Sequence, residues 1–149
     1  MNMRKLIIGA TIAAFGCGAA MAQSTLGDLL DAKAEKLSKE DVQTTIVGST
    51  MSGPIPGGMN IDAEYKADGT YAGSYQNPSG GQGGGRAGGF FGKWTLGDDG
   101  KFCTEGTGGT GKATGSCAFF FRLDGQLYIA YGSSTANRAA VAYKRSVKR

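Results

Sequence analysis

The sequence predicts an all-β protein, a small antiparallel meander that closes into an eight-stranded barrel, with a short N-terminal helical cap. Turns such as Asp-Asp-Gly at 98–100 and Asp-Gly at 124–125 separate short apolar runs, and these turns are strong hairpin signals. Several runs alternate apolar and polar residues with the period of two that half-buried strands have. The connections are mostly short, and closing the meander removes its exposed edges.

The predicted strands lie near residues 45–53, 59–66, 70–76, 90–96, 100–105, 116–123, 126–132 and 138–145. An eight-stranded barrel has an interior that side chains fill or that holds one small ligand. An open sandwich is the alternative architecture.

Residues 1–22 have the layout of a secretory signal peptide. Arg4 and Lys5 precede the apolar run Leu6–Phe15, and Ala20-Met21-Ala22 provides an A-x-A-like cleavage site. The apolar run is shorter than the ~20 residues that a bilayer-spanning helix needs. We therefore expect cleavage near Ala22, a periplasmic or secreted mature protein, and no membrane span in it.

Cleavage would leave two of the three cysteines, Cys103 and Cys117. In an oxidising compartment such a pair forms a disulfide by default, and we expect its role to be structural. Lipidation of Cys17 is the alternative to plain cleavage, although Ala14-Phe15-Gly16 is a poor lipobox. Metal binding would need further ligands, and the chain has no histidine, so we predict neither a metal site nor a cofactor.

Residues 23–43 form the predicted helical segment that precedes the barrel domain at 44–149. Leucines at 26, 29, 30 and 37 have near-helical spacing between Thr25 and Lys36, with acidic residues early and lysines late, as the helix dipole favours. Ser38-Lys39-Glu40-Asp41 resembles a capping box. It begins either a short second helix or one helical turn that leads into a strand at Thr44–Ser49.

The stretch Met59–Gln76 is the clearest predicted hairpin. A loop at residues 67–69 pairs Tyr65 with Tyr71 and places Tyr75 on the same face, while the polar residues between them face water. Three tyrosines on one inner face are either core aromatics, whose hydroxyls find partners at the rim, or the wall of a ligand site.

Two glycine-rich stretches, near 77–89 and 106–115, are predicted to be flexible loops. Residues 83–88 and 106–111 match the spacing of a dinucleotide fingerprint. That motif needs a preceding strand and a following helix, and neither stretch begins a helix. In a chain with 27 glycines such matches arise by chance.

A four-residue loop at Gly97–Gly100 would pair Trp94 with Cys103. Because strand side chains alternate, that register gathers Trp94, both cysteines, Phe119 and Phe121 on one face, with the indole against the disulfide.

The next predicted hairpin, 118–123 with 126–131, is apolar on both faces and must be covered on both. We expect one face in the main core and the other under a helix or a second subunit. One face carries Phe119, Phe121, Leu123, Tyr128 and Ala130, and the other carries Ala118, Phe120, Leu127, Ile129 and Tyr131.

Charge and composition exclude more functions than they suggest. Loss of residues 1–22 lowers the net charge from +4 to +2, which indicates no particular partner, and we expect no nucleic acid. All charged residues after Asp124 are basic, and this tail is either a solvated terminus or a contact for anions.

With no histidine and no catalytic constellation, we expect no enzyme. Glu105, near the cysteines, is the acid best placed for acid–base work.

The G-x-W at Gly92–Trp94, the D-G-K-x-C turn at Asp99–Cys103, the second cysteine and the D-G-x-x-Y ending at Tyr128 form one pattern. It resembles small secreted proteobacterial proteins of domain-of-unknown-function type. The resemblance covers about residues 92–131. It implies a periplasmic lipocalin-like β fold and brings no known activity or site.

Two functions are consistent with these features, and fold alone does not choose between them. The first is a non-enzymatic binding protein for a small apolar or aromatic ligand, which predicts a cavity lined by rings. The second is a protein-interaction or inhibitor domain that acts through the glycine-rich loops and the basic tail, which predicts an exposed patch and no cavity. The candidate ligand-binding residues are Tyr65, Tyr71, Tyr75, Trp94, Phe119 and Phe121.

Overall fold

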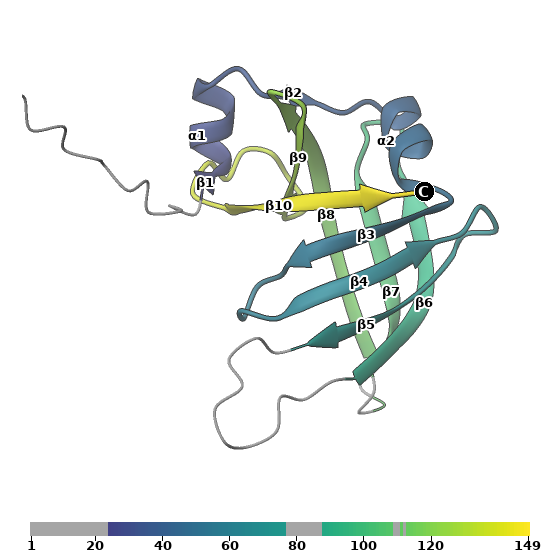
Figure 1. The fold of residues 1–149 in the computed structure, drawn as a ribbon. Coiled ribbons are helices and arrows are strands. Elements are labelled where there is room, and N and C mark those ends of the chain that lie inside the picture. Colours follow the sequence, from purple (N-terminus) through teal and green to yellow (C-terminus); the bar gives the residue numbers. More distant parts are fainter. Residues whose placement is uncertain (1–23, 77–87, 109–110, 112) are drawn as a thin grey trace, which may run out of the picture.

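In the computed structural model, which describes residues 24–76, 88–108, 111 and 113–149, eight antiparallel strands close into a barrel (Figure 1). Strand β10 closes it, because it pairs with β9 on one side and with β3 on the other. The predicted all-β, eight-stranded barrel is confirmed, and the open sandwich is wrong. The strands are β3 (Ser49–Pro54), β4 (Asn60–Tyr65), β5 (Thr70–Gln76), β6 (Gly88–Leu96), β7 (Phe102–Gly108), β8 (Ala113–Leu123), β9 (Gln126–Tyr131) and β10 (Val141–Lys148).

Two short strands lie outside the closed barrel. Strand β1 (Ser24–Thr25) pairs with β10, and β2 (Glu35–Lys36) pairs with β8. The predicted signal peptide at residues 1–22, including Cys17, lies outside the described residues.

The strand boundaries differ from the predicted ones at several places. The β7–β8 hairpin continues past the cysteines, with Gly106 paired to Thr114 and Thr107 to Ala113, so the predicted loop at 106–115 is too long. Gly88 and Gly89 belong to β6, and the rest of the predicted 77–89 loop lies almost wholly outside the described residues. Glycines without a turn signal thus extend strands here, because the partner strand supplies the hydrogen bonds.

Both N-terminal helices begin at capping boxes. In α1 (Leu26–Asp31) the Thr25 hydroxyl accepts from the Asp28 N–H, and in α2 (Lys39–Ile46) Ser38 and Asp41 make the same exchange. The predicted first helix is too long, because residue Lys33 has a φ of 65° and the chain then joins β8 as β2. The second helix is longer than one turn, so β3 begins at Ser49 rather than near 45.

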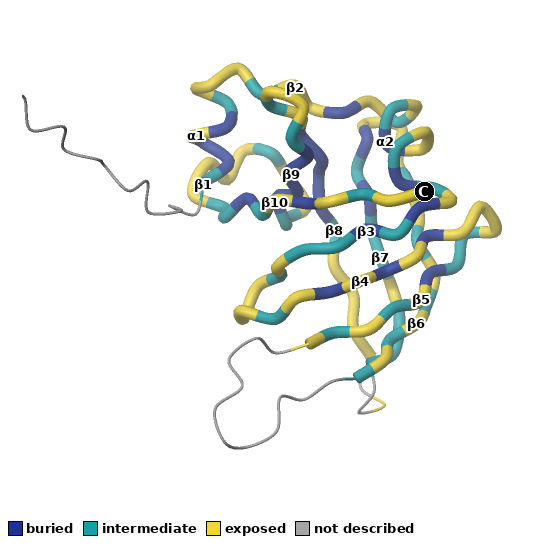
Figure 2. The backbone as a smooth tube through the Cα atoms, in the orientation of Figure 1, coloured by how far each residue is buried: buried dark blue, intermediate teal, exposed yellow. Residues whose placement is uncertain are grey.

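The helices cover two different parts of the barrel (Figure 1). Helix α2 closes one end, where Val42 and Ile46 pack with Leu37 against the interior aromatics. Helix α1 lies on the outside, where Leu26 and Leu29 cover the outer face of β8 and β9. Figure 2 shows that buried residues gather around these helices and become sparser toward the opposite end.

The two apolar faces of β8 and β9 are divided between these layers, as the sequence predicts. Phe120 points into the barrel, and Phe119 and Phe121 lie outside it under α1. A second subunit is not needed to cover this outer face, because α1 covers it.

The predicted contact between Trp94 and the disulfide is wrong. Leu96 pairs with Phe102 and Trp94 with Thr104, one residue away from the predicted register. Because side chains alternate, this shift sends Trp94 into the barrel and leaves Cys103 outside. Inside, the indole stacks on Phe102 at 5.6 Å, and its N–H donates to the carbonyl oxygen of Lys66.

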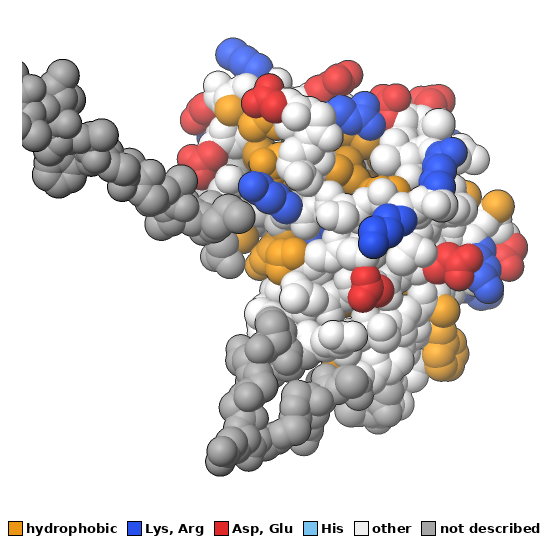
Figure 3. Space-filling view, in the orientation of Figure 1, with side chains coloured by type: hydrophobic (Ala, Val, Ile, Leu, Met, Phe, Trp, Pro, Cys, Tyr) orange, Lys and Arg blue, Asp and Glu red, His pale blue; other side chains and the backbone are white. Residues whose placement is uncertain are grey.

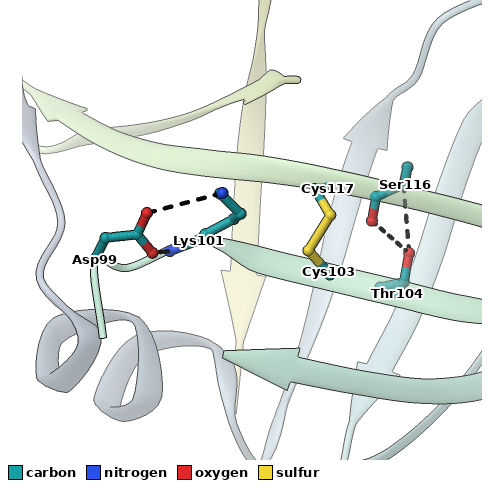
Figure 4. The surroundings of a disulfide bond; sticks show 6 residues. All are labelled: Asp99, Lys101, Cys103, Thr104, Ser116 and Cys117. Carbon is teal, nitrogen blue, oxygen red and sulfur yellow. Dashed lines mark hydrogen bonds and ion pairs between the residues drawn. A yellow bond between two sulfur atoms is a disulfide. The ribbon is translucent and has the colours of Figure 1, made fainter. Parts of the chain in front are cut away.

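The Cys103–Cys117 disulfide is present and joins directly opposed residues of β7 and β8, with a Cα–Cα distance of 4.0 Å (Figure 4). The adjacent pair Thr104 and Ser116, joined through their side-chain oxygens at 3.3 Å, belongs to the inward-facing set. The disulfide therefore fastens two strands from the outside and takes no part in lining the interior.

Candidate functional site

A cavity of about 260 Å³ lies inside the barrel, at the end opposite α2. Its wall comes from strands β4 to β9 and from the connection between β3 and β4. We call the barrel end opposite α2 the mouth. The wall carries six aromatic rings, Tyr65, Tyr71, Tyr75, Phe90, Phe102 and Tyr131, with aliphatic side chains including Ile55, Met59, Ile61 and Ile129.

The tyrosine hairpin supplies one side of the wall through strict alternation. Tyr65 pairs with Tyr71, and Ile61 pairs with Tyr75, which is the predicted register. The rings of Tyr65 and Tyr71 stack with centroids 5.6 Å apart, and Phe102 meets Tyr65 edge-on at 5.2 Å. Such packing holds the rings in fixed positions around the cavity.

Glycines on neighbouring strands make room for these rings. An added Cβ at Gly73 would meet the ring of Phe90, one at Gly88 would overlap the ring of Tyr75, and one at Gly106 would meet the hydroxyl of Tyr71. Glycine in a strand often marks such a close approach, and an aromatic ring on a neighbouring strand can cover the gap. The glycines of β5, β6 and β7 are therefore part of how the cavity wall is built.

Among these glycines, Gly92 is the position where an added side chain would clash most severely. A Cβ there would overlap the carbonyl oxygen of Glu105 and the Cα of Gly106, which are backbone atoms of the paired strand. We expect Gly92→Ala to destabilise the protein by about 1–3 kcal/mol through overpacking. The matched control is Gly108→Ala on β7, where a Cβ meets nothing within 4 Å. Urea denaturation of both variants measures the difference, and equal midpoints would contradict this account of β6.

Arg145 is a charged side chain buried beside the cavity wall, with 2% of its surface exposed. Its Nη1 donates to the carbonyl oxygens of Pro54 and Lys144, and its Nη2 donates to the Tyr131 hydroxyl at 2.9 Å. The absence of a side chain at Gly53 leaves room for the guanidinium, since a Cβ there would lie 3.0 Å from Nη1. Tyr131 thus connects the cavity with a buried positive charge.

Burial affects the ionisation of Tyr65, Tyr71 and Tyr131 in the wall. It raises the pKa of Tyr65 strongly, and it also raises the pKa values of Tyr131 and Tyr71. The positive charge of Arg145 and its hydrogen bond oppose this shift at Tyr131 without reversing it. The hydroxyls of all three are therefore protonated at neutral pH and can donate hydrogen bonds.

Of the six predicted ligand-binding residues, the structure places Tyr65, Tyr71 and Tyr75 in the cavity wall. Trp94 faces the interior but packs in the core and does not line the cavity. Phe119 and Phe121 were placed wrongly, because they lie on the outer face of β8 under α1. Phe119 and Phe121 were predicted at the site because the same one-residue register error put Trp94 on their face of the sheet.

Four residues that shape the site were not predicted from the sequence: Phe90, Phe102, Tyr131 and Arg145. The signal for Phe102 was its alternation with Thr104 on β7, which the wrong loop length hid. Tyr143, Arg145 and Val147 alternate on β10, and this pattern could have indicated that Arg145 faces inward.

No three His, Cys, Asp or Glu side chains among the described residues lie close enough together to hold a metal ion. Glu105 is exposed on β7, on the face opposite the cavity.

Neither helix in the described ranges is long and apolar enough to cross a membrane. No family model, curated protein or solved structure matches the chain.

Proposed function

We propose that this protein is a non-enzymatic binding protein for a small apolar or aromatic ligand that enters the barrel cavity from its mouth. The ring-lined cavity is the observation that carries the proposal. Ligand sites are concave, mostly apolar and furnished with a few polar groups, and this wall has that composition.

The volume limits the size of the ligand. An apolar cavity of about 150 Å³ accepts benzene, so about 260 Å³ corresponds to a ligand of about ten non-hydrogen atoms. A single ring with a short side chain, or two fused rings, meets this limit.

The cavity favours this function over the alternative of a protein-interaction or inhibitor domain. That alternative predicted no cavity, and it relied on the glycine-rich loops and on the basic tail as a free surface. Instead, residues 141–148 form the last barrel strand, and Arg145 points inward. On the face drawn in Figure 3, charged side chains of both signs are interspersed near the helix end.

We propose that the protein acts after export. The layout of residues 1–22 is that of a signal peptide, and the Cys103–Cys117 disulfide is compatible with a periplasmic or extracellular location.

Indole is a suitable neutral probe, and nuclear magnetic resonance titration at neutral pH is the test. We expect saturable shifts of amide signals around the cavity. Ala118→Leu should weaken binding at least about tenfold, because Ala118 lines the cavity and the larger side chain would occupy part of it. The control is Thr107→Leu, at a position of β7 that does not line the cavity. Absence of saturable shifts with the wild-type protein, or equal binding by Ala118→Leu, would overturn the proposal.

A further inference from the structure

Among the described residues, Arg145 is the one buried charged side chain, and no acidic side chain neutralises it. The ion pairs among all described residues are Lys39–Asp98, Lys101–Asp99 and Arg138–Asp31, and none of them includes Arg145. The acceptors of the Arg145 guanidinium are two carbonyl oxygens and one phenol, which are neutral, and its buried Nε has no acceptor there. A buried charge without a counter-charge is costly, so an anion nearby would be stabilised.

The Tyr131 hydroxyl links this buried charge to the cavity, because it bonds to Arg145 and belongs to a residue of the cavity wall. Its oxygen accepts from Nη2 of Arg145, which leaves its own proton free to donate, and the described residues offer no acceptor for that proton. Tyr131 lines the cavity, and so does Tyr65, whose hydroxyl is close enough to Arg145 to be affected by its positive charge. This side of the cavity therefore presents hydrogen-bond donors backed by a cation.

Much of the remaining wall is apolar, although Thr104, Thr114 and Ser116 also contribute hydroxyl groups to it. Ile55, Met59 and Ile61 contribute only apolar surface near the mouth, and Phe90 adds a ring. A ligand that matches both parts has an apolar body and an acceptor group that reaches the Tyr131 hydroxyl.

We infer that the ligand is a small carboxylate, with a carboxylate oxygen at the Tyr131 hydroxyl and an aromatic or aliphatic body among the rings of the wall. The inference rests on the proposed function and names its ligand class. The hydrogen bond to the carboxylate is charge-assisted, because the acceptor is ionised and the donor is polarised by Arg145. Arg145 acts through Tyr131 as a positioning and polarising residue.

Two compounds of nearly identical shape test this inference: 3-phenylpropanoate and 3-phenylpropanamide. Isothermal titration calorimetry at neutral pH should show the carboxylate binding at least about tenfold more tightly than the amide. Tyr131→Phe keeps the ring and removes the donor, so it should reduce the preference to about one. Tyr143→Phe is the matched control, since that ring also faces the Arg145 guanidinium, at 6.0 Å, without lining the cavity. It should retain the preference.

The outcomes separate the inference from the function on which it rests. Equal binding of the two compounds to the wild-type protein, or a preference that survives Tyr131→Phe, would overturn the carboxylate inference and leave the binding function intact. Failure of both compounds and of indole to bind would overturn both proposals. Arg145→Met, where it folds, should lose the preference as Tyr131→Phe does. A retained preference there would contradict the role of the buried cation.

Discussion

Replacing Phe120 by alanine should lower the free energy of unfolding by about 3–5 kcal/mol, the usual cost of removing a fully buried phenylalanine. Phe120 is 0% exposed and meets Phe102 edge-on, with ring centroids 5.7 Å apart. It lies inside the barrel in the cluster that α2 closes. The loss should therefore include both the apolar surface removed from the core and a new void beside existing rings.

Urea denaturation followed by circular dichroism measures this effect. The matched control is Phe91→Ala on β6, because Phe91 points outward and is 65% exposed. It should change stability by no more than about 1 kcal/mol. Similar losses for the two variants would mean that Phe120 does not face the core. Phe120→Leu, with a smaller expected loss, keeps the test informative where the alanine variant fails to fold.

Removal of the disulfide should have the next largest effect. On the chain-entropy model, closing a loop of about 15 residues stabilises by about 3 kcal/mol, and the two cysteines are 14 residues apart. The double variant Cys103→Ala with Cys117→Ala should lose about that amount. Because the disulfide lies on the outer face of β7 and β8, indole affinity should change by less than about twofold.

Comparison with the reduced protein controls for the substitutions themselves. Dithiothreitol should lower the denaturation midpoint of the wild-type protein toward that of the double variant and leave the double variant unchanged. A folded double variant that no longer binds indole would contradict the outer placement, because it would show that the disulfide shapes the cavity.

The parts of the fold predicted correctly are those where local sequence fixes a register. In the hairpin of Tyr65 and Tyr71, polar residues alternate with apolar ones, so a slip of one residue would expose the tyrosines. The predicted capping box at Ser38 similarly fixes where the second helix begins. In each case a few neighbouring residues exclude the alternatives.

The errors occurred where local sequence is permissive. Both a four-residue and a five-residue connection suit the Asp-Asp-Gly turn, and the N–H of Gly97 in fact bonds to the carbonyl oxygen of Lys101. The one extra residue in the connection decides whether the Trp94 side chain lies on the same face of the sheet as Cys103 or on the opposite face. The strand holding Phe119, Phe120 and Phe121 is apolar on both faces, so alternation alone does not say which face lies inside.

Two features of the site depend on tertiary structure and had only weak sequence signals. Glycines in β5, β6 and β7 are distinguishable from loop glycines only once the rings that occupy their space are known. A basic residue near a C-terminus is usually solvated, whereas Arg145 is buried because the terminal strand closes the barrel.

The claim that the barrel interior receives the ligand is tested most directly by isotope-filtered nuclear Overhauser spectroscopy of the ¹³C-labelled protein with unlabelled indole. We predict contacts from indole protons to the rings of Tyr65 and Tyr71 and to the methyl groups of Ile61 and Ile129. Contacts confined to outward side chains such as Phe91, with none to these four residues, would contradict it.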